Sequence, residues 1–258
     1  MCLLTFRYQS ASEVPLVFAG NRDEFYDRPT APATFWEEAP HVLAGRDLKA
    51  GGTWMGVTRN GHWGVVTNVR EPGAYRPDAT SRGTLVADYL REEPAPAAYL
   101  QSIAAEADRY NGFNLLLGTP RSLHYYSNRA DGPRPVEPGL HGLSNDRLDT
   151  PWPKVQRATR ALERELADGD PSPEALLALL DDRRPAPDEA LPNTGLSRDR
   201  ERMLSPIFIE GDEYGTRAST VLLIGREGTV TFVERTFDRG EPEETRSFSF
   251  EVAVPSSS

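Results

Sequence analysis

The order of predicted elements along the chain indicates an α+β fold. Segments that alternate apolar and β-favouring residues come in groups, and two stretches of helical periodicity separate these groups. This order, in which groups of strands alternate with groups of helices, is typical of sheets packed between helical layers. With 258 residues, 38% of them hydrophobic, the chain can bury a sizeable core, and we expect a single domain over residues 1–258.

The N-terminal part of the chain predicts a strand hairpin that begins at its start. Residues 2–8 and 15–19 have strand character, and the polar residues 9–13 between them predict the turn. The following segment, 27–40, is rich in proline and alanine and predicts an ordered surface loop. A second strand pair is expected beyond that loop.

This second pair comprises residues 51–58 and 62–68. Asn60-Gly61 lies between them, and this dipeptide is a strong signal for a type I′ hairpin turn. The remaining helical segments are 81–91, 96–110, 153–167 and 173–180, and the remaining strands are 113–118, 124–127, 216–224, 229–235 and 246–252. Residues 181–199 contain few apolar side chains and predict a long surface loop.

Composition excludes several classes of function. A formal net charge of −10 argues against nucleic-acid binding, which needs clustered cations to neutralise phosphates. The start of the chain lacks the features of a signal peptide, and its longest apolar stretches are too short to span a bilayer. A single cysteine excludes an intramolecular disulfide and a zinc site built from paired cysteines. These properties predict a cytoplasmic protein without a membrane span.

The single cysteine, Cys2, directly follows the initiator methionine. Removal of Met1 would leave Cys2 with a thiol and a free α-amino group on one residue. The amine has an ordinary pKa of about 7.7 to 8.0, so it can take the thiol proton itself or through one water. The alternative is that Cys2 is a small core residue, which is the commoner use of a lone cysteine.

Five further residues are candidates for a site around Cys2. Arg22 on the facing strand of the hairpin is a cation that favours the thiolate, and Asp23 can hold the amine by a charge-assisted hydrogen bond. Asn68 and Asn145 end apolar strands and can donate to the oxyanion of an acyl-transfer reaction. Arg217 begins a late strand. Their ordinary roles would be a surface salt bridge for the Arg-Asp pair, turns or helix caps for the asparagines and a solvated strand end for Arg217.

These residues together resemble a known family. The chain is similar throughout to the NRDE family, also called the transport and Golgi organisation protein 2 family. The motifs that carry the resemblance are Met1-Cys2, Asn21-Arg22-Asp23-Glu24-Phe25 with Arg28-Pro29, Gly51-Gly52-Thr53-Trp54-Met55-Gly56, Thr67-Asn68, Tyr110-Asn111-Gly112-Phe113-Asn114-Leu115, Gly142-Leu143-Ser144-Asn145, Thr150-Pro151-Trp152 and Tyr214-Gly215-Thr216-Arg217. Many motifs in one order are more specific than any of them alone.

That family resembles the cysteine-type N-terminal-nucleophile (Ntn) hydrolases, such as penicillin V acylase and bile salt hydrolase. The resemblance implies a four-layer αββα sandwich with Cys2 at the end of a central strand. It also implies roles for the candidates. These are Cys2 as the nucleophile, Arg22 as the arginine beside it, Asp23 as the residue that orients the amine, Asn68 as the oxyanion asparagine, and Asn145 and Arg217 as further site residues.

One motif departs from the acylase pattern. The acylases have Gly-Arg-Asn-x-Asp with arginine and aspartate three residues apart, whereas Arg22 and Asp23 are adjacent here. Neighbouring strand residues point to opposite faces, so both can approach Cys2 only where the strand ends or bulges. Glu24 is an alternative to either residue, and Asn21 is an alternative for the position nearest the nucleophile.

Two functions are therefore expected from the sequence. The first is hydrolysis of a non-peptide amide bond in a small acyl compound, without a required cofactor. The alternative is a non-catalytic protein on the same fold that binds and carries haem, a lipid or acyl-coenzyme A, because a fold does not determine a function. Haem ligands are offered only by scattered residues outside any haem-attachment motif, namely His41, His62, His124, His141 and Met203. The ligand is a small acyl or hydrophobic molecule in either case, and a homo-oligomer is left open.

Overall fold

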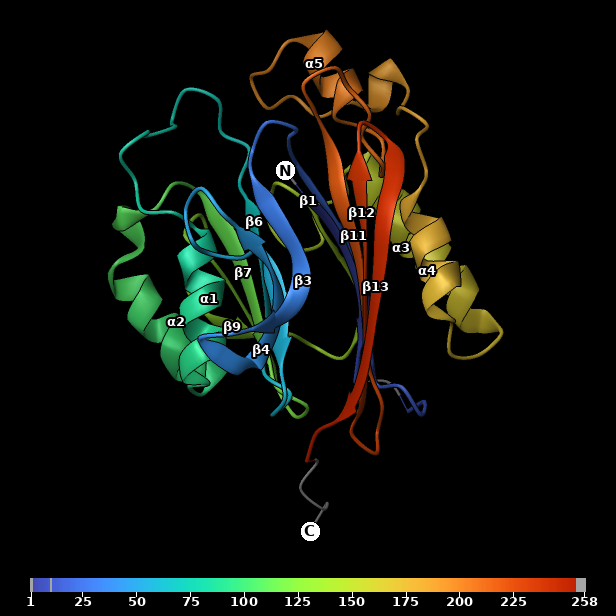
Figure 1. Ribbon diagram of the computed structural model, residues 1–258. Coiled ribbons are helices and arrows are strands. Elements are labelled where there is room, and N and C mark those ends of the chain that lie inside the picture. Colours follow the sequence, from blue (N-terminus) through green and yellow to red (C-terminus); the bar gives the residue numbers. More distant parts are fainter. Residues whose placement is uncertain (1, 10, 254–258) are drawn as a thin grey trace.

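The chain folds into four layers. The structure is a computed structural model that describes residues 2–9 and 11–253. Two mainly antiparallel sheets pack face to face, and a helical layer covers the outer face of each (Figure 1). The predicted α+β fold and its αββα sandwich are confirmed. Met1 lies outside the described residues, so the predicted removal of Met1 stays a prediction.

The six-stranded sheet contains the N-terminal strand next to one of its edge strands. Its strands run in the order β10-β1-β2-β11-β12-β13, and all of their pairings are antiparallel. Their bounds are Gly139–Leu143 for β10, Cys2–Tyr8 for β1, Leu16–Phe25 for β2, Tyr214–Ile224 for β11, Thr229–Asp238 for β12 and Glu241–Glu251 for β13. The first predicted hairpin is β1 and β2, which continues past the predicted end to Phe25.

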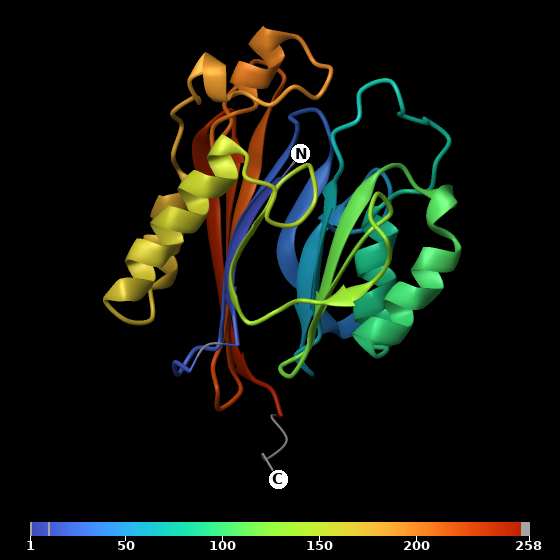
Figure 2. The ribbon, with the colours of Figure 1, turned by 180° about the vertical axis from the view of Figure 1, so that it is seen from behind.

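The seven-stranded sheet is built from one continuous part of the chain. Its strands follow the sequence order from β3 to β9, and the helices of one layer lie in the connection between β6 and β7. Their bounds are Thr30–Trp36 for β3, Ala39–Asp47 for β4, Met55–Thr58 for β5, Trp63–Asn68 for β6, Phe113–Gly118 for β7, Leu123–Ser127 for β8 and Arg134–Pro135 for β9. Figure 2 shows the connection from β9 to β10 crossing between the two sheets.

Each sheet has its own helical layer. Helices α1 (Gly83–Glu92) and α2 (Pro96–Ala105) pack on the seven-stranded sheet, and α3 (Pro153–Ala167) and α4 (Pro173–Leu180) pack on the six-stranded sheet. The short elements are η1 (Ala107–Arg109), η2 (Asp188–Ala190) and α5 (Arg198–Met203). In the described part of the chain, no helix combines the length and apolar character needed to cross a membrane.

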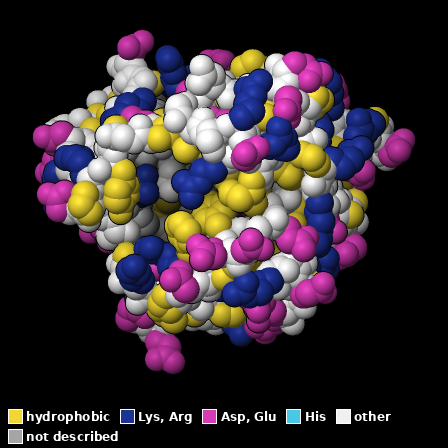
Figure 3. Space-filling model, turned by 90° about the horizontal axis from the view of Figure 1, so that it is seen from above, with side chains coloured by type: hydrophobic (Ala, Val, Ile, Leu, Met, Phe, Trp, Pro, Cys, Tyr) yellow, Lys and Arg dark blue, Asp and Glu magenta, His cyan; other side chains and the backbone are white. Residues whose placement is uncertain are grey.

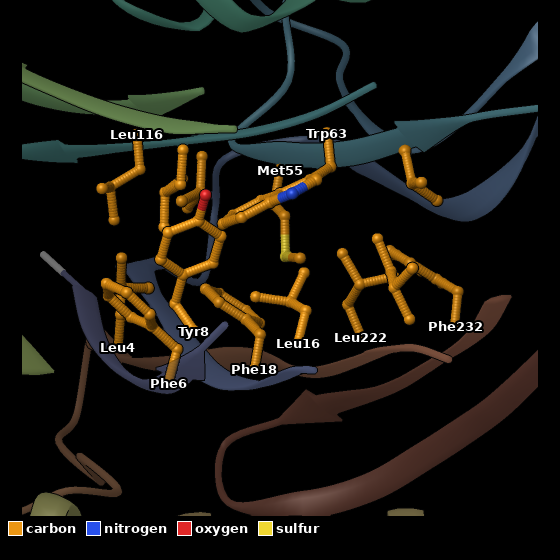
Figure 4. Close-up of a cluster of buried hydrophobic side chains, with 14 of the residues drawn as sticks. Leu4, Phe6, Tyr8, Leu16, Phe18, Met55, Trp63, Leu116, Leu222 and Phe232 are labelled. Carbon is orange, nitrogen blue, oxygen red and sulfur yellow. The ribbon is translucent and has the colours of Figure 1, made fainter. Parts of the chain in front are cut away.

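The main hydrophobic core lies between the two sheets. Leu4, Phe6 and Phe18 project from the six-stranded sheet toward Met55 and Trp63 of the seven-stranded sheet (Figure 4). Successive strand residues face opposite sides, so alternate residues of β1 enter this core while Leu3 faces the helical layer of α3. The side chain of Cys2, two residues before Leu4, therefore belongs to the inter-sheet face.

The prediction of a surface loop at residues 27–40 is wrong, because this segment contains the strand β3. Its prolines gave the loop signal, and β3 is the edge strand of its sheet, where a missing N–H is tolerated. The pairing of β3 with β4 is broken between Ala31 and Thr34, around Pro32. The interruption removes the regular alternation by which a strand is recognised in a sequence.

Two loop predictions also differ in detail. The hairpin of β5 and β6 is present, but its turn is not type I′. That turn needs positive φ at both central residues, and only Gly61 has one, with a φ of 84°. Residues 181–199 are irregular except for η2 and the start of α5 at Arg198. Ala186 and Leu191 are buried in this segment, so it packs against the domain rather than lying free on its surface.

Candidate functional site

Cys2 and Arg22 occupy neighbouring positions on the inter-sheet face. Cys2 is the first residue of β1 and pairs directly with Arg22 of β2. Cross-strand partners project to the same face of a sheet, so both side chains point toward the seven-stranded sheet. They line a cavity of about 450 Å³ at the ends of these strands. The predicted placement of Arg22 on the strand facing Cys2 is confirmed.

Arg22 is nearly buried and is held by an aromatic ring. Its side chain is 7% exposed, and its guanidinium lies 4.3 Å from the ring centroid of Trp54. The nearest carboxylate is that of Glu24, with 3.9 Å between Nη2 and Oε2. Within the described residues, the guanidinium forms no hydrogen bond. The positive charge and the N–H donors of Arg22 are therefore available to the cavity beside the Cys2 thiol.

The neighbours of Arg22 on β2 point to the helical side. Asn21 donates from Nδ2 to the carbonyl oxygens of Leu180 and Ile207, both at 3.0 Å, and it accepts from Ser219. Its amide is committed to the layer formed by α3 and α4. The structure therefore does not place the side chain of Asn21 beside the thiol, contrary to that alternative.

Asp23 points to the helical side, like Asn21, and follows the last described pair of β1 and β2, Cys2 with Arg22. Its carboxylate is buried, and Oδ1 accepts a hydrogen bond from Thr216 Oγ1 at 2.8 Å. Asp23 pairs with Thr216 and Arg22 pairs with Ala218, so Arg217 is an extra residue in β11 at this point. Both Arg22 and Asp23 line the cavity. β2 pairs regularly with β1, so the bulge expected there is absent, and the two residues meet the cavity where β1 begins at Cys2.

The surroundings of Cys2 favour the protonated thiol. Burial raises the pKa of the thiol, and the charge of Asp23 raises it further. Arg22 and the backbone N–H of Asp23 act in the opposite direction, since both stabilise the thiolate. Because the net effect is a raised pKa, a thiolate at neutral pH requires a base close to the sulfur.

The two candidate asparagines have different positions. Asn68, the last residue of β6, lines the cavity, and its side-chain amide makes no hydrogen bond to any described residue. Asn145 is buried behind it and donates from Nδ2 to the carbonyl oxygen of Asn68 at 2.8 Å. The neighbouring Ser144 donates from Oγ to the carbonyl oxygen of Cys2 at 2.9 Å. Asn68 is thus available to a ligand, whereas Asn145 braces the strand end that carries it.

Arg217 does not line the cavity at Cys2. Its Nη1 donates to the carbonyl oxygens of Phe25 and Tyr26 at 3.0 Å, and to that of Arg28 at 3.4 Å. The guanidinium therefore fixes the turn that follows β2. Glu24 does line the cavity, between the guanidinium groups of Arg22 and Arg28, with 3.9 and 3.8 Å to these groups.

Several residues that line the cavity had no predicted role in the site. Trp54 stacks on Arg22, and Arg82 and Tyr75 line the cavity from the segment before α1. The sequence signal for this part was the Gly51-Gly52-Thr53-Trp54 motif. A Cβ on Gly52 would meet the backbone carbonyl carbon of Gly83 at 2.4 Å, so glycine allows the start of α1 to approach the cavity.

The cavity is lined mainly by polar and charged side chains. The face seen from above is hollowed and mixes hydrophobic, basic and acidic groups (Figure 3). Tyr75 and Phe25 are 69% and 50% exposed, and Tyr75 belongs to the lining. Beneath Cys2 a second, apolar cavity extends between the sheets past Met55 and Val65, but its volume is only about 10 Å³. That space admits roughly one water molecule.

None of the candidate haem ligands lies at this cavity. His141 contacts the carboxylate of Asp149, and His62 lies 3.8 Å from that of Glu93. His41 contacts backbone carbonyl oxygens of α1, and Met203 lines a different surface depression. No histidine occurs among the described residues that line the cavity at Cys2.

Comparison with known proteins identifies the family. The family model described as Transport and Golgi organisation 2 matches residues 1–239. The chain belongs to this family. It is 35% identical to the transport and Golgi organization protein 2 homolog of Bos taurus, over 99% of this chain and 100% of that protein. It is 29% identical to transport and Golgi organization protein 2 of Drosophila melanogaster, over 94% of both chains. The predicted family is confirmed.

Two solved structures have a comparable arrangement. One is a Caenorhabditis elegans N-acylethanolamine-hydrolyzing acid amidase ortholog, with a TM-score of 0.46 and 13% identity over 86% of this chain and 92% of that one. The other is a mutant conjugated bile acid hydrolase from Clostridium perfringens, with a TM-score of 0.48 and 6% identity over 99% of both chains.

Proposed function

We propose that this protein is a cysteine amidohydrolase of the N-terminal-nucleophile type, which cleaves the non-peptide amide bond of a small polar acyl compound. The observation that carries the proposal is the position of Cys2. The only thiol of the chain lies at the start of an interior strand, opposite a nearly buried arginine, and it lines a cavity large enough for a small molecule.

The proposed reaction begins with the α-amine that removal of Met1 would expose. The α-amine of Cys2 takes the thiol proton, and the thiolate attacks the carbonyl carbon of the substrate amide. The C–N bond then breaks, and the leaving amine takes a proton from the α-ammonium group. Water, deprotonated by the α-amine, attacks the thioester and releases the carboxylic acid together with the free thiol.

The other residues of the site have complementary roles in this proposal. Asn68 has an unengaged side-chain amide in the same cavity, and with a backbone N–H it would stabilise the oxyanion. Arg22 stabilises the thiolate, and Asp23 orients the amine from a buried position fixed by Thr216. Asn145 and Arg217 act at a distance, by holding the chain that carries Asn68 and the turn after β2.

The lining of the cavity favours a small polar substrate. The apolar space beneath Cys2 holds roughly one water, so it cannot take an acyl chain. The acyl and amine parts would therefore both lie in the main cavity, among Arg22, Arg82 and Asn68. The alternative of a haem or lipid carrier has less support, because the described lining offers neither a histidine nor a long apolar slot.

A comparison of the wild type with Cys2→Ala tests the proposal. Intact mass first establishes whether Met1 is absent, since retention of Met1 would remove the amine base. Hydrolysis of a panel of small N-acyl compounds is then followed by release of the amine. We expect turnover by the wild type and a rate at background for Cys2→Ala.

Iodoacetamide provides a matched control, because Cys2 is the only cysteine in the chain. Alkylation should abolish turnover by the wild type and leave any residual rate of Cys2→Ala unchanged. Equal rates for the two proteins on every hydrolysed compound would exclude Cys2 as the nucleophile. Haem titration belongs to the same experiment, since a saturable shifted absorption band without any hydrolysis would favour the carrier.

A further inference from the structure

Lys154 is a buried lysine outside the residues predicted for the site. It lies in the first turn of α3, and its side chain is 2% exposed. The ammonium nitrogen has no hydrogen-bond partner among the described residues. Burying an ammonium group without hydrogen bonds is unfavourable, so a compensating charge must lie nearby.

Asp23 offers that charge at longer range, since Lys154 forms no ion pair or hydrogen bond with the described residues. Its carboxylate projects from β2 to the face of the sheet that α3 covers, and it is 2% exposed. Among the charges that act on Lys154, Asp23 is the strongest, and among those that act on Asp23, Lys154 is the strongest. Burial lowers the pKa of Lys154 to about 8, with the charge of Asp23 opposing this effect. At neutral pH the lysine therefore still carries its proton.

Other charged groups surround this pair. The strand β2 contributes Arg22 and Glu24, and the segment after β6 contributes Arg70, which forms a buried ion pair with Glu201 of α5 at 2.6 Å. The remaining charged or titratable groups near Cys2 or Lys154 are Arg82 before α1, Arg157 of α3 and Tyr214 of β11. The Arg70 charge is largely balanced by Glu201. Lys154 is thus the buried cation that acts on Asp23 from the helical side, beside Arg22 on the other face.

We propose that Lys154 is a positioning residue of the cysteine site, whose ammonium charge acts with Asp23 to make it easier for Cys2 to lose a proton. The Cys2 thiol and α-amine must together give up one proton before attack, as the proposed function requires. A positive neighbour destabilises the protonated amine and stabilises the thiolate. The direction of the effect is the same whichever of the two groups releases the proton.

This role predicts how the reactivity of Cys2 changes with pH. Without the Lys154 charge, Asp23 would hold a proton on the α-amine and oppose the thiolate. The midpoint of thiol reactivity should therefore rise by about one pH unit, which means a roughly tenfold slower reaction below the midpoint. A merely structural role of Lys154 would change stability without moving this midpoint.

Iodoacetamide alkylation across pH, followed by intact mass, measures the midpoint without knowledge of the substrate. Lys154→Met and Lys154→Gln remove the charge, and Lys154→Arg keeps it. Arg164→Met is the matched control, because it removes a positive charge from an exposed position in the last turn of the same helix, outside the cavity. We expect the upward shift in Lys154→Met and Lys154→Gln alone. A wild-type midpoint in either variant, in protein that unfolds cooperatively, overturns the inference.

The outcomes separate this inference from the proposed function. A shifted midpoint with no hydrolysis of any amide would sustain the role of Lys154 and refute the amidohydrolase. Amide hydrolysis by the wild type together with unshifted midpoints would sustain the amidohydrolase and refute the role of Lys154. With an identified substrate, the acidic limb of kcat/KM in Lys154→Met should move in the same direction as the alkylation midpoint.

Discussion

Glu234 of β12 is a buried carboxyl group that connects the two sheets. Its side chain is 1% exposed and faces the seven-stranded sheet, where Oε1 accepts a hydrogen bond from the backbone N–H of Ala33 at 2.6 Å. Burial raises the pKa of this carboxyl to about 7, although Arg22 and Arg246 act to lower it. The protein should therefore become less stable as pH rises through the neutral range.

The sign and size of this effect follow from linkage. The folded-state pKa lies above the ordinary value of 4.5, so the folded protein favours the protonated carboxyl. The stability contribution of that proton is fully present below about pH 4.5 and is lost as pH rises through about 7. A rise from 4.5 to about 7 corresponds to about 3 kcal/mol of unfolding free energy.

Glu234→Gln isolates this contribution. Glutamine keeps the acceptor for the Ala33 N–H but does not titrate, and the other carboxyl groups titrate alike in both proteins. We expect the stability difference, variant minus wild type, to rise by about 3 kcal/mol between about pH 4.5 and pH 8. Urea unfolding followed by circular dichroism measures it at each pH.

Glu227→Gln is the control for Glu234→Gln. It removes the same charge from an exposed turn between β11 and β12, so its stability profile should run parallel to that of the wild type. A stability difference for Glu234→Gln that does not change with pH would refute the assignment of a protonated, buried carboxyl at this position.

Two further predictions concern the support of the site. In Gly142→Ala the new Cβ would meet Val155 Cγ1 at 2.6 Å and Thr159 Oγ1 at 2.7 Å, so α3 must move from β10. We expect a loss of about 1–3 kcal/mol in urea unfolding, and an unchanged midpoint would contradict this packing. Asn145→Ala leaves the carbonyl of Asn68 without its 2.8 Å donor, at a cost of about 1–3 kcal/mol. If Asn145→Ala and the wild type have the same urea midpoint of unfolding, water replaces the lost hydrogen bond to Asn68.

Elements with strong local signals were predictable from the sequence. The helices expected at 153–167 and 173–180 have the same bounds as α3 and α4. Both begin with proline, whose fixed φ suits the first turn, and Ser172 caps α4 by accepting from the Ala175 N–H. These signals act within a few residues, so they do not depend on the rest of the fold.

β3 was not predictable in the same way. Its prolines predict a loop when they are considered alone, and the strand exists because it pairs with β4 at the edge of the sheet. The turn at Asn60-Gly61 is a similar case. The hairpin was correct, but its turn type depends on backbone angles that the dipeptide does not fix.

For the site, the sequence by itself determined the chemistry of its parts. It placed a single cysteine after the initiator methionine and a hairpin at the start of the chain, whose second strand leads toward Arg22. Only the tertiary structure decided which side chains meet. Arg22 and Asp23 meet one cavity where β1 begins, and the packing of α3 places the buried Lys154 on the helical side of the same sheet. Such contacts join residues far apart in sequence, so no local pattern encodes them.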